Sequence, residues 1–198
     1  MEKKKSQITQ YDKPLADHQQ KFLSLLDSVG LPSTDIFVPV SERLVVFNNA
    51  HSLLERMDDT SKSEAVYVSK FFAAVSAGLF DAALNYIWDE TVLHLRKRIE
   101  AYDLEYFYEI AASEEKRKDL KTIEDISKLT DEELLRGSLN IELISETGFR
   151  NIDLVKYMRN NASAAHPNQL EVTGLKLISM AEDCLKEVIS TPILLPNL

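Results

Sequence analysis

The segment SEAVYVSKFFAAVSAGLFDAALNYIWDETVLHLRKRIEA, residues 63–101, carries the longest helical pattern of apolar residues in the chain. From Val68 to Leu95 these residues recur at intervals of three and four, the spacing that gives a helix one apolar face. Alanines in the middle of the segment are small enough to let a second helix approach closely. A single interior glycine costs a helix only about 1 kcal/mol, so we predict one long helix with a kink or break at Gly78.

Amphipathic patterns predict further helices on both sides of this segment. Their expected ranges are 15–29, 41–57, 134–144, 152–166 and 173–190. Ser41, Thr130 and Thr173 stand where a helix would begin, and their hydroxyls suit the capping position. The chain has only 5 glycines and 6 prolines, too few for the many tight turns of an all-β fold. We therefore predict an all-α fold, an up-and-down bundle of five to seven helices, and assign no strand.

The domain organisation expected from this pattern is simple. The 198 residues and 44% hydrophobic content suit a single core with a small appendage. We predict a flexible N-terminal arm over residues 1–13, which are mostly polar, and a helical domain over residues 14–198. Within that domain, residues 102–148 have a less regular pattern, and we interpret them as an insertion or lid attached to the bundle.

Composition limits the classes of function. The 32 acidic and 23 basic residues give a formal charge of -9, which is unlike a general nucleic-acid coat protein, so any RNA contact must be a local patch. The one cysteine, Cys184, excludes a disulfide within the chain and a cysteine-rich zinc site. A charged start without an apolar run predicts neither a secretory signal nor a membrane span. We expect a cytoplasmic protein.

The run RNNASAAHP, residues 159–167, concentrates the chemistry of the chain. If it is helical, Arg159 and His166 are almost two turns apart and share one face. RNA cleavage by its own 2′-hydroxyl needs a group that exchanges protons near neutrality, which histidine does, and a cation that stabilises the charged transition state. Asn160 would orient the phosphate, Lys156 would add a phosphate contact, and no metal is required.

The same run has a simpler interpretation, because an arginine and a histidine at this spacing occur by chance in many proteins. Three details favour a site. Adjacent asparagines and a mid-helix Ser163 are poor choices for a plain helix interior, and the small residues clear space around the two long side chains. Pro167 ends the helix, so that His166 would lie at the C-terminal end, where the helix dipole favours an imidazolium.

The run resembles the active helix of the HEPN superfamily (higher eukaryotes and prokaryotes nucleotide-binding). In those all-helical domains an arginine, a polar residue and a histidine stand near the start of the final helix pair. Arg159, Asn160 and His166 match these three positions, with a spacing at the long end of the family's range. The resemblance is specific over about residues 152–190, and residues 102–148 have no counterpart in it.

The resemblance implies an endoribonuclease that needs neither a metal nor a cofactor. Its cleavage would leave a 2′,3′-cyclic phosphate on the RNA. The resemblance also implies a homodimer in which two motif helices form one composite site, with Arg159, Asn160 and His166 as catalytic residues. Lys156, Asn161 and Ser163 are candidates for contacts with the RNA. Such domains act in toxin–antitoxin and phage-defence systems, so an antitoxin or regulatory partner is expected. Some are catalytically silent dimerisation or partner-binding modules, which is the alternative function.

Tyr157 and the basic run after His94 are weaker candidates for a functional role. Some HEPN toxins are silenced when a partner nucleotidyltransferase modifies a tyrosine near the motif, and Tyr157 is the residue that raises this question, although it lies on a different face from Arg159. His94 precedes the basic residues Arg96 to Arg98, which would approach an RNA backbone or simply form a solvated helix face. The histidines show no metal-ligand spacing. Trp88 is expected in the core or an interface.

Overall fold

The computed structural model describes residues 2–162 and 171–191, with side chains from residue 13 onward. Over these ranges the chain forms ten α-helices, one 3₁₀ segment and one π segment, and no β-strand. The predicted all-α class is therefore confirmed. The elements are α1 (Glu2–Ser28), α2 (Val40–Leu54), α3 (Asp59–Glu64), α4 (Val66–Ala77), α5 (Phe80–Tyr102), α6 (Leu104–Ala111), α7 (Glu114–Arg117), η1 (Ile123–Lys128), α8 (Asp131–Asn140), α9 (Glu146–Asn161), α10 (Gly174–Cys184) and η2 (Leu185–Ile189).

The segment predicted as one long helix is divided into α3, α4 and α5. Gly78 causes the second division, because its φ of 77° lies in the left-handed region and ends α4 with a hydrogen bond from its N–H to the Val75 carbonyl. The first division falls at Ala65, where the carboxylate of Glu90 on α5 accepts hydrogen bonds from Tyr67 N and Val68 N at the start of α4. The break predicted at Gly78 is thus a complete reversal of the chain.

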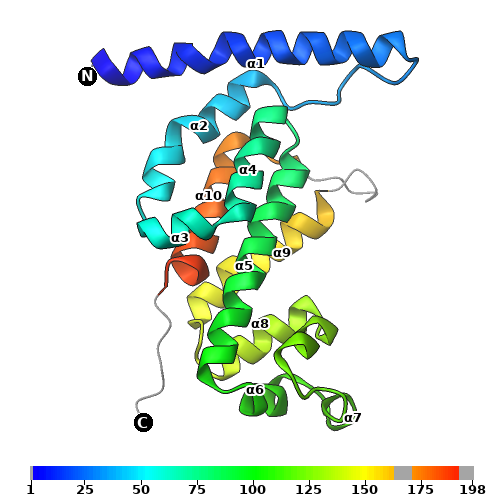
Figure 1. The fold of residues 1–198 in the computed structure, drawn as a ribbon, viewed down its shortest axis with the longest axis vertical. Coiled ribbons are helices and arrows are strands. Elements are labelled where there is room, and N and C mark those ends of the chain that lie inside the picture. The colour runs from blue at the N-terminus through cyan, green and yellow to red at the C-terminus, as the bar shows by residue number, and fades with distance from the viewer. Residues whose placement is uncertain (1, 163–170, 192–198) are drawn as a thin grey trace.

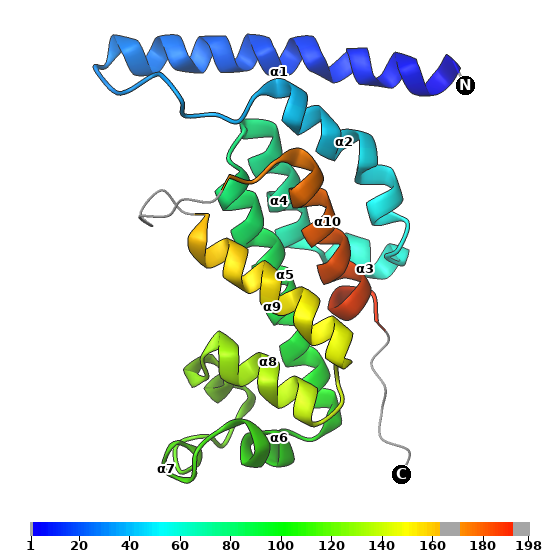
Figure 2. The ribbon, with the colours of Figure 1, turned by 180° about the vertical axis from the view of Figure 1, so that it is seen from behind.

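Helix α5 runs through the middle of the molecule, and the other helices are arranged along it (Figure 1). Helices α2, α4 and α10 lie around its first half, α9 crosses it, and α6 to α8 lie at its far end (Figures 1 and 2). One apolar face of α5 is fully buried and contributes much of the core. Its members are Phe80, Ala83, Leu84, Ile87, Trp88, Leu95 and Ile99. Trp88 is therefore a core residue, as expected.

Helix α1 lies across the opposite end of the molecule from α6 and α7 (Figures 1 and 2). Residues 2–13, expected to be a flexible arm, are helical and continue into the helix predicted at residues 15–29. The arm is rich in lysine, glutamine and other residues with good helix propensity, and the helix continues through Pro14 although an interior proline removes a backbone donor and crowds the preceding turn. Phe22 and Leu25 on α1 have exposed apolar side chains, as does Val29 directly after the helix.

The insertion over residues 102–148 contains α6, α7, η1 and α8. Its helices are short, so the sequence pattern of each covers too few turns to stand out, but side-chain caps begin them. Asp103, Ser113 and Thr130 each accept a hydrogen bond from a backbone N–H in the first turn. Gly137 on α8 allows a close approach, since a Cβ there would lie 2.6 Å from that of Ala111 on α6. The region interpreted as an insertion is therefore largely helical, with α6 and α8 packed against each other.

The last described helix begins as predicted, with Thr173 as the cap that accepts a hydrogen bond from Lys176 N. Helix α10 buries Leu177, Met180 and Cys184, and continues into the π segment η2. Burial raises the pKa of the Cys184 thiol to about 12, in keeping with a packed core residue. None of the helices in the described part of the chain is long and apolar enough to cross a membrane.

Candidate active site

Helix α9 carries most of the residues singled out from the sequence. It begins at Glu146 rather than near residue 152, because Ser145 caps it by accepting a hydrogen bond from Gly148 N at 3.0 Å. Its buried face follows the helical repeat and packs into the core. The members of that face are Gly148, Phe149, Ile152, Val155 and Met158. This packing fixes the rotation of the helix, and it leaves Lys156 and Arg159 on one flank.

Arg159 lies where three helices meet. Its guanidinium forms an ion pair with Asp131 in the first turn of α8, and its Cζ lies 5.1 Å from the centroid of the Trp88 ring on α5. The side chain is 22% exposed, so the cation is close to the surface without being fully solvated. Its Nε is buried and has no hydrogen-bond partner. Arg159 is therefore held by one replaceable carboxylate and one aromatic face.

Lys156 occupies the adjacent turn of the same flank. Its ammonium pairs with Glu132 of α8 and, at 2.7 Å, with Asp153 of α9, and its side chain is 13% exposed. Burial alone would lower the pKa of Lys156, but the hydrogen bonds to Asp153 and Glu132 outweigh it and raise that pKa. Lys156 in turn holds the pKa of Glu132 below its usual value. The ammonium is thus firmly charged.

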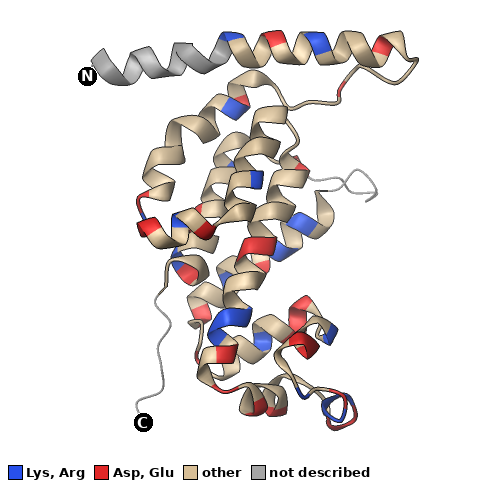
Figure 3. Cartoon of the chain, in the orientation of Figure 1, with Lys and Arg blue, Asp and Glu red and all other residues tan. Residues whose placement is uncertain are grey.

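Asp89 of α5 is a further acid beside these ion pairs, in addition to Asp131, Glu132 and Asp153. Burial raises its pKa, the charges of Arg159 and Lys70 oppose that rise, and the charge of Asp131 adds to it. The structure therefore brings two cations of α9 into one cluster with Asp89 of α5 and the two acids of α8. We call these five residues, Asp89, Asp131, Glu132, Lys156 and Arg159, the α9 charge cluster. Figure 3 shows charged residues gathered around α8 and α9, whereas α2 and α4 are mostly uncharged.

The remaining candidates are only partly described. Asn160 is exposed, and Asn161 donates from its side-chain amide to the Tyr157 carbonyl at 2.7 Å. Tyr157 is 54% exposed on the outer face of α9. His166 and Ser163 lie outside the described residues, so the structure neither joins them to the α9 charge cluster nor separates them from it.

The predicted helix at residues 152–166 ends earlier than expected. Helix α9 stops at Asn161, and the N–H of Ala162 makes a last bond to the Met158 carbonyl at 2.8 Å. Two adjacent asparagines favour this end, because asparagine has low helix propensity and the Asn161 amide competes for a backbone carbonyl. The same-face relation of Arg159 and His166 therefore does not follow from the described helix.

Sequence reasoning missed the acidic members of the cluster. Asp131 and Glu132 follow a capping threonine, and acids in the first turn of a helix are already explained by the helix dipole. Nothing in their spacing from α9 indicates that they contact Lys156 and Arg159, because α8 and α9 are brought together only by packing. Asp89 gave no signal either, since it is a single acid on a long helix.

The basic residues after His94 differ in their environments: Lys97 is exposed, whereas Arg98 has a structural role. Arg98 is buried and donates to the carbonyls of Leu143 and Glu187, so it is not available to an RNA backbone. His94 pairs with the buried carboxylate of Glu90, at 3.2 Å. Among the described residues, no group of three or more histidine, cysteine and acidic side chains is arranged to hold a metal ion.

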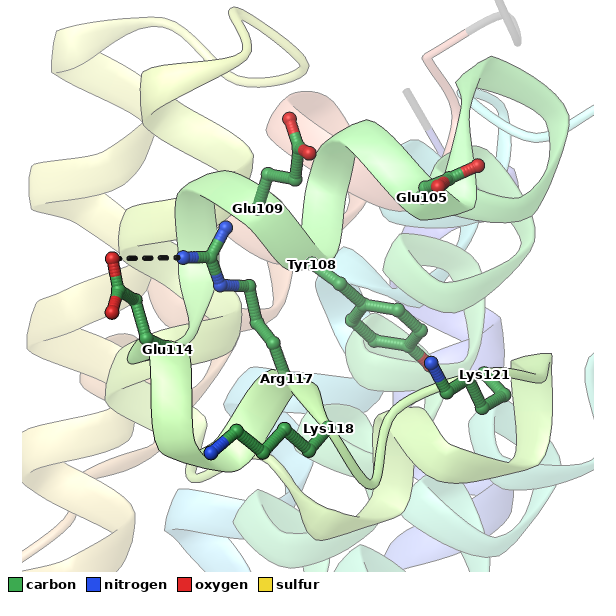
Figure 4. Close-up of a pocket in the computed structure, with 7 residues that line it drawn as sticks. All are labelled: Glu105, Tyr108, Glu109, Glu114, Arg117, Lys118 and Lys121. Carbon is green, nitrogen blue, oxygen red and sulfur yellow. Dashed lines mark ion pairs between the residues drawn. The ribbon is translucent and has the colours of Figure 1, made fainter.

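Surface hollows lie apart from the α9 charge cluster. One, of about 310 Å³, is formed by α6, α7 and the segment after α7 (Figure 4). Its acids come from α6 and the start of α7, its bases come from the end of α7 and the segment after it, and Arg117 is turned toward Glu114 (Figure 4). A larger hollow of about 570 Å³ lies beside the end of α9 and has an acidic lining that includes Glu42, Asp81 and Glu171. Neither offers a net positive surface to a phosphate.

Comparisons with known proteins add no relatives. No protein-family model, no curated protein and no solved structure matches this chain.

Proposed function

We propose that the chain is a metal-independent endoribonuclease of the HEPN type, with Arg159, Asn160 and His166 as its catalytic residues. One observation carries the proposal beyond the sequence motif. Lys156 and Arg159 lie together at the C-terminal part of α9, close to the surface, and are held by carboxylates rather than by backbone carbonyls. Carboxylates and phosphates bind guanidinium and ammonium groups in the same way, so both cations suit an RNA backbone.

The proposed reaction is an internal transesterification. A base takes the proton from the 2′-hydroxyl, the 2′-oxygen attacks the phosphorus, and the bond to the 5′-oxygen breaks as that oxygen gains a proton. The products are a 2′,3′-cyclic phosphate and a 5′-hydroxyl. His166 acts as base or acid, Arg159 stabilises the additional negative charge, and Asn160 positions the phosphate. Lys156, Asn161 and Ser163 are the proposed contacts to the rest of the RNA.

A homodimer fits the outer face of α9. Leu154 is 56% exposed and Tyr157 stands one turn further along, so an apolar strip runs beside the proposed catalytic residues. Pairing of two such strips across a two-fold axis would bury both side chains and bring two motifs together. The proposal therefore includes a composite site at the seam between two copies, in a cytoplasmic toxin or phage-defence effector with an antitoxin or regulatory partner. The exposure of Tyr157 also keeps it as a candidate for regulatory modification.

A metal-free cleavage assay tests the proposal. We expect the wild-type protein to cleave RNA in the presence of EDTA and the His166→Ala protein to lose this activity. The matched control is His51→Ala, which changes a histidine that is exposed and pairs with Glu55 on α2, far from α9 in the fold. Equal cleavage by wild type and His166→Ala would refute the proposal.

The alternative is a catalytically silent HEPN-like module for dimerisation or partner binding. The exposed strip of Leu154 and Tyr157 and the charge of -9 favour it, because a binding module needs an apolar contact but no phosphate site. It predicts no cleavage, and weaker association on mutation of α9. Light scattering during size-exclusion chromatography of Arg159→Ala and Leu154→Glu separates the two functions. Under the ribonuclease proposal Arg159→Ala stays associated but inactive, whereas under the alternative both proteins dissociate.

A further inference from the structure

The first turn of α8 presents its acids to the cations of α9. Asp131 pairs with Arg159, and Glu132 pairs with Lys156. Consecutive acids thus face cations that are one helical turn apart. Lys156 has a second carboxylate partner, Asp153, on its own helix. Carboxylate and phosphate oxygens bind such cations in the same way, so a phosphate would compete with Asp131 and Glu132.

The pairing is incomplete at Arg159. Asp131 contacts the terminal Nη2, while the Nε of Arg159 is one of four buried side-chain polar atoms without a partner in the described part of the chain. A guanidinium usually binds a carboxylate or phosphate through two parallel hydrogen bonds. The two non-bridging oxygens of an RNA phosphodiester can accept from Nη2 and Nε together, so such a phosphate would also satisfy the nitrogen that Asp131 leaves unpaired.

Both acids also reach the surface. The side chains of Asp131 and Glu132 are 36% and 44% exposed, so a rotation of either side chain would bring its carboxylate into solvent. The helix itself is anchored elsewhere: Thr130 and Glu133 form a capping box, and Glu133 pairs with Lys116 of α7 at 2.5 Å. Glu132 has a second partner, Arg136, one turn away on α8, which would retain it after release from Lys156.

We infer that Asp131 and Glu132 form an acidic cover over a two-phosphate binding site made by Lys156 and Arg159. The inference rests on the proposed function and adds regulation to it. The ligand is two neighbouring phosphates of single-stranded RNA, and the cover must be displaced before the RNA engages Arg159. The insertion of residues 102–148 thereby gains a role, because it supplies the helix that lowers the affinity of the resting protein for RNA.

The test is an RNA-binding measurement in a background that cannot cleave. The Asp131→Asn/Glu132→Gln double variant is made in His166→Ala protein and titrated, with EDTA, into fluorescein-labelled single-stranded RNA of about 15 nucleotides. We expect the affinity to rise at least about fivefold at about 50 mM salt, with a smaller gain at about 200 mM. Arg159 then has no paired carboxylate, and Lys156 keeps only Asp153, so both cations are more available to phosphates.

Two controls separate a cover from a general change of charge. Glu114→Gln/Glu115→Gln removes two acids from the first turn of another insertion helix, α7, and should leave the affinity within twofold of the parent. Adding Lys156→Ala and Arg159→Ala to the α8 variant should abolish its gain. Thermal melts followed by circular dichroism establish that each variant is folded.

The outcomes are distinct. If the α8 variant and the α7 control bind RNA equally well, or if none of the proteins binds it, the acidic cover is refuted. The proposed function fails separately, when protein with intact His166 does not cleave RNA or when His166→Ala cleaves it equally. If the cover is correct, Asp131→Asn/Glu132→Gln with intact His166 also cleaves RNA at least about fivefold faster under subsaturating conditions.

Discussion

Arg43 and Arg159 are both arginines that neighbour aromatic rings, yet their environments differ in kind. Arg43 is 1% exposed and donates to the carbonyls of Val38 and Ser76 and to the side-chain oxygen of Gln19. Burial lowers its pKa, and no carboxylate pairs with it among the described residues. Arg159 is instead held by the carboxylate of Asp131 near the surface. Arg43 therefore has the environment of a structural residue. Arg159 has the environment of an anion-binding residue whose place is taken by Asp131.

The groups that bind the guanidinium separate structural from functional arginines in this fold. Two of the three oxygens that accept from Arg43 are backbone carbonyls, which cannot leave without a local change of the fold. Arg98 belongs to the same class, since it is buried and binds the carbonyls of Leu143 and Glu187. A side-chain carboxylate can rotate away and be replaced by another anion. The comparison predicts that the two classes respond oppositely to mutation.

The largest effect is expected at Arg159, and it concerns activity. We predict that Arg159→Ala lowers metal-free RNA cleavage by about 10²–10³-fold, the usual loss when one donor to a transition-state oxyanion is removed. Its free energy of unfolding should fall by only about 1 kcal/mol, because a partly exposed ion pair contributes little. Cleavage rates and urea denaturation measure the two quantities. A large loss of stability with unchanged cleavage would show that Arg159 is a structural arginine like Arg43.

The next effect concerns stability at Arg43. Arg43→Met keeps most of the side-chain volume but leaves three acceptors without their donor, so we expect the free energy of unfolding to fall by about 2–3 kcal/mol. Urea denaturation measures the loss. RNA cleavage by the folded protein should remain close to wild type, and a loss comparable to that of Arg159→Ala would show that Arg43 is not merely structural.

Gly78 offers a smaller change at the same structural arginine. Gly78→Ala places a methyl group 2.5 Å from the Arg43 Nη2 and forces alanine to a φ of 77°. We expect a destabilisation of about 1–2 kcal/mol, or a fall in Tm of about 2–8 °C for a chain of this size. Calorimetry provides the measurement, and Gly30→Ala is the control, with a similar φ but open space around its Cβ. Equal losses would mean that contact with Arg43 contributes nothing.

The smallest effects are pH-dependent and lie within the α9 charge cluster. Burial raises the pKa of Asp89, so its folded state favours the proton and loses stability as pH rises through that raised pKa. The stability of Asp89→Asn relative to wild type should therefore increase as pH rises. The hydrogen bond from Lys156 lowers the pKa of Glu132, so its stabilisation is present above the ordinary pKa of glutamate and is lost as pH falls.

Unfolding free energies between about pH 3 and 7 measure both slopes. The difference between Asp89→Asn and wild type should grow with pH in favour of the variant, and the difference for Glu132→Gln should grow in favour of wild type. Each change should be smaller than that of Gly78→Ala, because both carboxyl groups retain some access to water. Parallel curves for the two variants would contradict the assigned environments.

Much of the fold could be predicted because its signals are local. The periodic apolar positions of α5, the cap at Thr173 and a break at Gly78 depend on neighbours within a few residues, whereas the reversal of the chain at Gly78 was not predicted. Short helices were harder. The four residues of α7 span barely one turn, which is too short for a repeat to show. The extent of α1 was also missed, because polar residues were expected to be unstructured although most of them favour helix.

The candidate site was predictable only in part for the same reason. Lys156 and Arg159 follow one another along α9, so their common flank could be read from their spacing. Asp131 is 28 residues from Arg159 in sequence, and its ion pair exists only because α8 packs against α9. The position of Asp131 in the first turn of α8 already explained an acid there, so nothing in the sequence indicated its ion pair with Arg159. The carbonyls around Arg43 were equally invisible, since backbone groups carry no sequence signal.

We propose that Arg159 belongs to a metal-independent site in which the 2′-hydroxyl of RNA attacks the adjacent phosphate. The chemical nature of the cleaved RNA ends tests this reaction most directly. We predict that wild-type protein in EDTA produces fragments that end in a 2′,3′-cyclic phosphate, and that Arg43→Met produces the same ends. Intact RNA after incubation with wild type in EDTA, or fragments that end in a 3′-hydroxyl, would contradict the account.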